Sequence, residues 1–186
     1  MFADSRRASP TRRISGTALQ KRRSRLITAA GVADAVMTRA TGPGERRGTV
    51  LDRLSVRRTV VVYGPRAADH VWDSYVRPQR WPEWSPQIRS VDYPAETLRP
   101  HTGGVVHGPV GLRAGFRITG VDPAGPVRSW TWSVSMLGVR LVLRHTVEPV
   151  AGGTRTGLTV DGPAPLVIGY LPVARSALRR LVSRDR

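Results

Sequence analysis

Residues 127–136 read VRSWTWSVSM, and their pattern is the strongest indication of secondary structure in the chain. Large apolar side chains alternate along it with small hydroxyl side chains: Trp130, Trp132, Val134 and Met136 against Ser129, Thr131, Ser133 and Ser135. Neighbouring side chains of a β-strand point to opposite faces of the sheet. The alternation therefore predicts a strand with one apolar face, which is buried, and one face lined by hydroxyl groups.

Three further segments repeat this alternation. Their inward-facing sets are Leu112, Ala114, Phe116 and Ile118; Leu141, Leu143, His145 and Val147; and Thr156, Leu158 and Val160. Turn sequences separate the segments, at Thr102-Gly103-Gly104, Gly108-Pro109, Asp122-Pro123-Ala124-Gly125-Pro126, Leu137-Gly138 and Ala151-Gly152-Gly153. Short strands separated by such turns are typical of an antiparallel meander. The same pattern places His145 on a buried face.

The elements before the meander differ in kind. A β-branched run predicts a first strand over residues 54–64, and the stripe of Val71, Trp72, Tyr75 and Val76 predicts a helix over residues 67–76. The prolines in WPEWSP, residues 81–86, leave room for one further helical turn before a strand near residues 87–92.

A helix closes the chain. Beginning at Ala164, apolar residues recur at helical spacing, namely Val167, Leu171, Ala174, Leu178 and Leu181. Pro172 lies inside this pattern and is expected to kink the helix near residues 168–169, because an interior proline removes a backbone donor. A run of strands followed by a long helix predicts an α+β fold.

Composition excludes several classes of protein. The chain contains no cysteine, so disulfide bridges, thiolate metal ligands and a thiol nucleophile are excluded. The apolar stretch at residues 26–37 is interrupted by Asp34 and is shorter than the roughly 18 to 20 apolar residues that cross a bilayer. We expect a soluble, cytoplasmic protein with one folded domain over residues 51–186.

The net charge of +17 is densest near the N-terminus, where residues 1–50 hold eleven basic and three acidic side chains. Apolar side chains are too few there to offset the entropy lost on ordering, so we expect a disordered basic tail. A tether to nucleic acid or an anionic surface is a less favoured interpretation of this tail. Two others are an export signal around Thr11-Arg12-Arg13-Ile14 and non-structural sequence from an upstream translation start.

Several spaced motifs resemble those of one superfamily. They are Pro65 before Val71-Trp72, Trp81-Pro82-Glu83-Trp84-Ser85-Pro86, Asp122-Pro123, and His145-Thr146-Val147-Glu148-Pro149 running into Gly152-Gly153-Thr154-Arg155. With the order of elements, they resemble the START-like (SRPBCC) helix-grip superfamily, in its polyketide cyclase/dehydrase and lipid-transport branch. The resemblance implies a curved antiparallel sheet wrapped around a long C-terminal helix, with two short helices after the first strand. It also implies a cavity between sheet and helix that binds lipids, polyketides or sterols.

The residues expected to line such a cavity are mostly aromatic. They are Trp72, Tyr75, Trp81, Trp84, Phe116, Trp130, Trp132, Val134, Leu143, His145, Leu158 and Tyr170. Aromatic rings suit planar apolar ligands, and they serve equally well to fill a core. The favoured hypothesis is a protein that binds or carries a hydrophobic small molecule, since the inward faces hold almost no polar groups.

An enzyme is the alternative. His145, with a reference pKa near 6.5, is the candidate proton shuttle of a polyketide cyclase, aromatase or dehydratase, with Tyr75 or Tyr170 orienting substrate oxygens. Catalytic residues vary within the superfamily, so the resemblance assigns none here. The spacing of Glu96, His101 and His107 matches no metal site, and no phosphate-binding loop or nucleophile elbow occurs. We therefore expect no metal and no cofactor.

Overall fold

The computed structural model describes residues 55–136 and 138–183. The interpretations of the basic tail, residues 1–50, lie outside the described residues. The first half of the described chain comprises β1 (Ser55–Gly64), α3 (Ala68–Val76), the 3₁₀ turn η2 (Pro78–Arg80), α4 (Trp81–Trp84), β2 (Ser90–Asp92) and β3 (Gly103–His107). The second half comprises the 3₁₀ turn η3 (Pro109–Gly111), β4 (Arg113–Asp122), β5 (Arg128–Met136), β6 (Val139–Val150), β7 (Gly153–Pro163) and α5 (Ala164–Val182).

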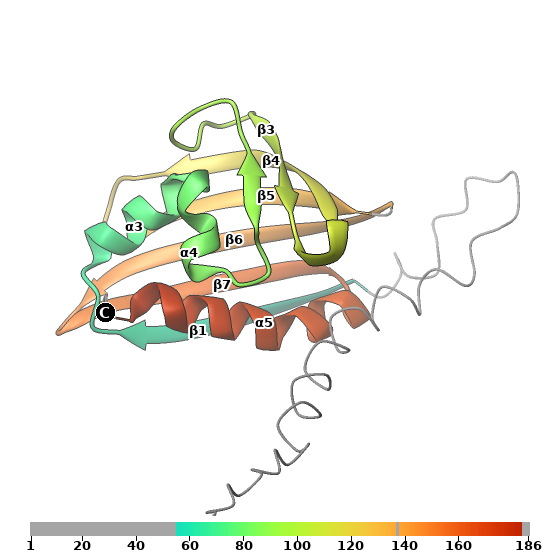
Figure 1. Ribbon diagram of the computed structural model, residues 1–186. Coiled ribbons are helices and arrows are strands. Elements are labelled where there is room, and N and C mark those ends of the chain that lie inside the picture. Colours follow the sequence, from blue (N-terminus) through green and yellow to red (C-terminus); the bar gives the residue numbers. More distant parts are fainter. Residues whose placement is uncertain (1–54, 137, 184–186) are drawn as a thin grey trace, which may run out of the picture. The chain divides into compact units, whose positions relative to one another are not determined.

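All strands belong to one antiparallel sheet in the order β1-β7-β6-β5-β4-β3-β2. Five consecutive strands, β3 to β7, form the predicted meander, and β1 closes it by pairing with β7. Figure 1 shows α3, α4 and α5 over one face of this sheet, with α5 beside β1 and β7. The predicted helix-grip fold is confirmed.

The alternation in β5 produces the expected buried face. Trp130 and Trp132 are 1% and 7% exposed. The strand lies inside the sheet, hydrogen-bonded to β4 on one side and to β6 on the other. A β-bulge in β4 between Ile118 and Gly120 shifts the register, so that Val121 lies opposite Trp130. Bulges increase the local bend of a strand, which curves this part of the sheet.

Helix α5 packs along the edge of the sheet where β1 and β7 lie. The predicted apolar positions Val167, Ala174, Leu178 and Leu181 are buried, and the helix continues through the exposed Pro172 from Ala164 to Val182. Its end approaches β1 so closely that a Cβ at Gly64 would overlap Val182. Glycine is required there because any side chain would push the helix away. Among the described residues, no helix is long and apolar enough to cross a membrane.

Two local expectations were wrong, and the second strand is shorter than predicted. Gly103 and Gly104 begin strand β3 instead of forming a turn, because the Phe116 ring lies over Gly104, where a Cβ would meet its Cζ at 2.7 Å. The second strand is confined to Ser90–Asp92. Leu112 precedes β4 and is 43% exposed, because the turn η3 ends just before it and the alternation starts only at Arg113.

Candidate functional site

Seven ring side chains meet between the sheet and the short helices, and we call them the aromatic cluster. They come from α3, α4, β4, β5 and β6: Tyr75, Trp81, Trp84, Phe116, Trp130, Trp132 and His145. Each is at most 7% exposed. All seven were predicted to face inward, and the structure brings them into mutual contact although they are far apart in the sequence.

Three rings of the cluster form a stack. Strands β5 and β6 place Trp130 directly opposite His145, and their rings lie parallel with centroids 4.3 Å apart and an interplanar angle of 4°. Trp81 of α4 stacks on Trp130 with centroids 5.4 Å apart and an angle of 26°. Trp132 meets Trp81 edge-on at 5.1 Å. The centre of the site is therefore built from flat apolar surfaces in contact with one another.

Tyr75 has its hydroxyl group already engaged. The Thr156 hydroxyl donates to the backbone oxygen of Thr146 at 2.9 Å, so the Tyr75 hydroxyl is the donor in its 2.8 Å contact with Thr156. Burial raises the pKa of Tyr75 well above its usual value, which keeps the phenol neutral. To donate to a substrate oxygen, as the enzyme hypothesis expects, the Tyr75 hydroxyl would have to give up its hydrogen bond to Thr156.

His145 is buried among rings. It is 3% exposed, and neither Nδ1 nor Nε2 has a hydrogen-bond partner among the described residues. Burial lowers its pKa from 6.5 to about 3, because the charged imidazolium would lose its hydration. A proton shuttle works best with a pKa near the working pH and with a polar partner within reach. The structure provides His145 with neither.

Two tryptophans of the cluster are also unpaired. The Nε1 atoms of Trp130 and Trp132 are shielded from solvent and have no acceptor among the described residues. By contrast, Trp81 donates to the backbone oxygen of Tyr75 at 2.8 Å, and Trp84 to that of Ser74 at 3.4 Å. Buried polar atoms are rarely left without a partner, so these two require an explanation.

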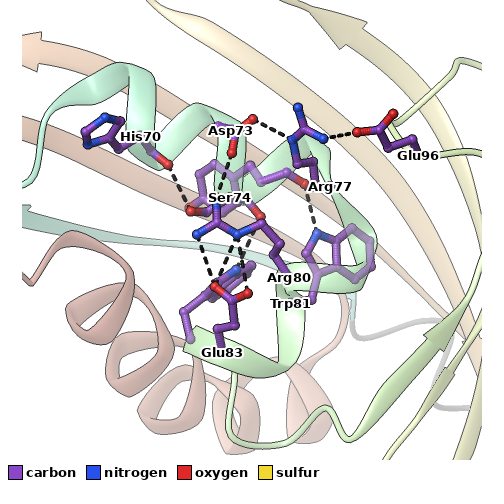
Figure 2. Close-up of polar contacts among 10 residues, drawn as sticks. His70, Asp73, Ser74, Arg77, Arg80, Trp81, Glu83 and Glu96 are labelled. Carbon is purple, nitrogen blue, oxygen red and sulfur yellow. Dashed lines mark hydrogen bonds and ion pairs between the residues drawn. The ribbon is translucent and has the colours of Figure 1, made fainter. Parts of the chain in front are cut away.

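The chain from Ala68 to Trp84, which we call the cover segment, contributes Tyr75, Trp81 and Trp84. Its polar contacts are largely internal, as Figure 2 shows: Asp73 pairs with Arg77 at 2.6 Å and with Arg80 at 2.7 Å, and Arg80 also pairs with Glu83. The hydrogen bond from Arg77 lowers the pKa of Asp73 and keeps it ionised. Together with the two indole bonds above, these contacts make the cover segment a cohesive unit.

Contacts with other elements tie the cover segment to the rest of the fold. Besides the bond between Tyr75 and Thr156 of β7, Asp69 pairs with Arg128 of β5 at 2.8 Å. Arg77 pairs with Glu96, and the backbone of Leu98 donates to Val76 at 2.8 Å. The Asp69 and Glu96 side chains are 88% and 77% exposed. Such exposed ion pairs contribute little, so the Tyr75 bond is the principal polar link across the interior.

The other predicted site residues lie around the cluster. Trp72 is half-buried and holds the Arg128 guanidinium 5.5 Å from its ring centre. Leu143 and Leu158 are buried and Val134 is half-buried beside them. Tyr170 of α5 accepts a 3.4 Å hydrogen bond from Gln87, and burial raises its pKa. Their role in ligand binding stays a prediction.

Sequence reasoning missed Tyr93, whose ring stacks on Phe116 with centroids 5.8 Å apart. It follows β2 in a loop, where no periodic pattern marks an inward direction. Its hydroxyl group accepts a hydrogen bond from the backbone of Arg99 at 2.9 Å, which fixes the ring at the edge of the cluster.

The aromatic cluster lies between the sheet and the short helices α3 and α4, whereas the resemblance implied a cavity between the sheet and the C-terminal helix α5. Two hollows on the described residues lie elsewhere, against α5. One is lined by Pro172, Arg175, Ser176, Arg179, Arg180 and Ser183, and the other by Val61, Val62, Tyr63, Arg175 and Arg179. Within residues 55–136 and 138–183, no group of His, Asp and Glu is placed to hold a metal ion.

Solved structures with low sequence identity share this fold. A hypothetical protein of Helicobacter pylori has 13% identity and a TM-score of 0.55, covering 76% of this chain and 96% of its own. The major latex-like protein 151 of Panax ginseng has 16% identity and a TM-score of 0.55, covering 69% and 95%. A protein of Mesorhizobium loti has 16% identity and a TM-score of 0.56, covering 68% and 93%.

At the level of sequence, no curated protein matches the chain significantly. The model of the family described as polyketide cyclase / dehydrase and lipid transport matches residues 53–185, which include every described element of the fold. The protein therefore belongs to the polyketide cyclase / dehydrase and lipid transport family.

Proposed function

We propose that this protein binds a planar, hydrophobic small molecule at the aromatic cluster, between the cover segment and the sheet. The observation that carries the proposal is the stack of Trp81, Trp130 and His145, in which one layer belongs to the cover segment and two belong to the sheet. A flat ligand that enters between Trp81 and Trp130 replaces one stacking contact with two. Family membership supports the same class of ligand.

Entry requires the cover segment to separate from the sheet. The internal bonds of Asp73, Arg77 and Arg80 persist when the segment shifts as a unit, so the motion breaks few polar contacts. The main polar link lost is the hydrogen bond between Tyr75 and Thr156. Each aromatic side chain offers roughly 150 to 250 Å² for contact, which is enough for the cluster to surround a ligand of several fused rings.

The surroundings of His145 do not favour catalysis. A cyclase or dehydratase that used His145 as a proton shuttle would need a polar partner for the imidazole and a pKa near neutrality. The described residues supply neither, since the histidine contacts the rings of Tyr75, Trp130 and Trp132. Binding or carriage of an apolar compound is the function that this geometry supports best.

Two measurements on the full chain test the proposal. Native mass spectrometry of protein purified from its own host is expected to show a co-purified hydrophobic compound. Titration with 2-ethylnaphthalene, followed by two-dimensional NMR of the indole N–H groups, is expected to shift the signals of Trp81, Trp130 and Trp132 saturably. Binding that moves only the signal of Trp72, which lies outside the cluster, would contradict the proposed location.

A further inference from the structure

Four buried nitrogen atoms of the aromatic cluster have no hydrogen-bond partner among the described residues. They are Nε1 of Trp130, Nε1 of Trp132 and both ring nitrogens of His145. The three rings are close neighbours, with centroid separations of 4.3, 5.5 and 6.4 Å. They project from neighbouring positions on β5 and β6, where Trp130 lies opposite His145 and Trp132 follows two residues along β5.

Within the aromatic cluster, the unpaired state is confined to these atoms. Trp81 and Trp84 belong to the same cluster and are equally buried, yet both indole groups donate to backbone oxygens of the cover segment. A buried polar group without a partner destabilises the protein, because it has lost its hydrogen bonds to water and gained none. Four such atoms on three neighbouring rings of an otherwise apolar core destabilise the folded protein. A ligand whose polar atoms form hydrogen bonds with them removes this destabilisation when it binds.

We propose that Trp130, Trp132 and His145 form a polar subsite, which holds a neutral oxygen-bearing group of the hydrophobic ligand. This inference rests on the proposed function and adds the chemistry of one end of the ligand. Each indole N–H donates one hydrogen bond, and a neutral imidazole supplies one donor and one acceptor. A carbonyl oxygen accepts from both indoles through its two lone pairs, and a hydroxyl group can also donate to the imidazole.

The surroundings select a neutral group over a charged one. Tyr75 is the titratable side chain whose ring contacts His145, and its proton is held by Thr156. On the cover segment, Asp73, Arg77 and Arg80 pair with one another at positions that are 33% to 40% exposed. On the strands, Leu143 and Leu158 pack beside His145 on the inner face. Arg128 lies two residues before Trp130 on the same face of β5, but its guanidinium is paired with Asp69 and held against the Trp72 ring. A carboxylate or phosphate bound at the subsite would therefore be desolvated without a free counter-charge.

Three compounds of one skeleton test the subsite on the full chain: 2-ethylnaphthalene, 2-acetylnaphthalene and 2-naphthoate. They present an apolar group, a neutral carbonyl and a carboxylate at the same ring position. We expect the ketone to bind about tenfold more tightly than the ethyl compound for each hydrogen bond formed, measured by titration calorimetry. The carboxylate is expected to bind more weakly than the ketone. Indole N–H signals of Trp130 and Trp132 should move downfield with the ketone, as hydrogen bonding requires.

Variants identify the donors. Trp132→Phe and Trp130→Phe each keep an aromatic ring and remove one N–H, so each is expected to lose about tenfold in affinity for the ketone. Affinity for 2-ethylnaphthalene should change much less, because that compound accepts no hydrogen bond. Tyr63→Phe removes a hydroxyl group from an exposed residue of β1 and serves as the matched surface control. It should leave both affinities unchanged.

The outcomes separate this inference from the proposed function. Equal affinities for the ketone and the ethyl compound would overturn the polar subsite while leaving hydrophobic binding intact. Tighter binding of 2-naphthoate than of the ketone would overturn its neutral character. If none of the three compounds binds, both proposals fail. If a tryptophan variant does not fold, the indole N–H signals of the unmodified protein still test the subsite. Signals of Trp130 and Trp132 that do not move downfield with the ketone would contradict it.

Discussion

His145 shows how one residue changes its chemical character when a fold closes around it. In the unfolded chain its imidazole is a hydrated base, with the ordinary pKa near 6.5. In the folded protein it is stacked on Trp130 and shielded from solvent, and burial lowers its pKa to about 3. The residue that alternation placed on an apolar face thus behaves as an aromatic ring with two unsatisfied nitrogen atoms.

This shift makes stability depend on pH. Above about pH 6.5, His145 is neutral in both states and costs no protonation energy. Between pH 6.5 and 3, the unfolded chain binds a proton at His145 that the folded protein excludes. The free energy of unfolding therefore decreases as the pH is lowered, by up to about 1.4 kcal/mol per pH unit. We expect a loss of about 2 kcal/mol between pH 6.0 and 4.5, measured by urea denaturation.

His145→Phe is the control for that experiment. It keeps a flat ring and removes both nitrogens, so the slope between pH 6.0 and 4.5 should largely disappear. Arg77 holds the pKa of Asp73 below its ordinary value. Asp73 therefore takes up its proton mostly below pH 4.5 and contributes little to the slope between pH 6.0 and 4.5. An unchanged slope in the variant would show that His145 is accessible to protons in the folded protein.

Among the elements, the cover segment is the part of the fold that governs access to the cluster. It contributes three of the seven rings, and its ion pairs hold its own turns together more than they hold it to the sheet. The Tyr75 hydroxyl is its buried polar link to β7. The contact between the cover segment and the sheet, which we call the closed form, therefore competes with a ligand that binds between them.

Tyr75→Phe tests this competition. The change removes the hydrogen bond to Thr156 and leaves the ring in place, which costs the closed form about 1 kcal/mol. Because opening becomes easier, affinity for 2-ethylnaphthalene should rise by about fivefold, measured by equilibrium dialysis. Tyr63→Phe is again the matched control. A fall in affinity, with the variant folded, would mean that the hydroxyl group contributes to binding and does not oppose it.

At the scale of the whole molecule, the described residues between Val56 and Val182 form a continuous hydrophobic core of their own. Deletion of residues 1–50 is therefore expected to leave cooperative unfolding intact and to change the melting temperature by less than about 2 °C. Circular dichroism of the full and shortened chains checks this. A drop of 5 °C or more would show that the basic N-terminal residues contribute to the folded domain.

Much of the architecture was predictable because it depends on local periodicity. Alternation in residues 127–136 and in the three other alternating segments predicted β4 to β7. Helical spacing after Ala164 predicted α5. The turn at Gly103 and Gly104 was predicted wrongly, since glycine marks a turn as readily as it marks a place where an aromatic ring crosses the backbone. Only the position of Phe116 on the next strand distinguishes the two.

Local periodicity alone assigned most of the buried faces, because a period of two or of 3.6 residues assigns faces to strands and helices without reference to partners. It failed at Leu112, which precedes its strand, and at Tyr93, which lies in a loop. Tertiary structure decided what those side chains do together. The pairing of Trp130 with His145 depends on the register of β5 against β6, and the stacking of Trp81 depends on a helix some 50 residues earlier in the chain. Whether inward-facing rings enclose a cavity or fill one another's space is a property of packing, which no single segment encodes. The unpaired nitrogens of Trp130, Trp132 and His145 also depend on packing. A nitrogen atom can be recognised as unpaired only when all of its neighbours in the fold are known.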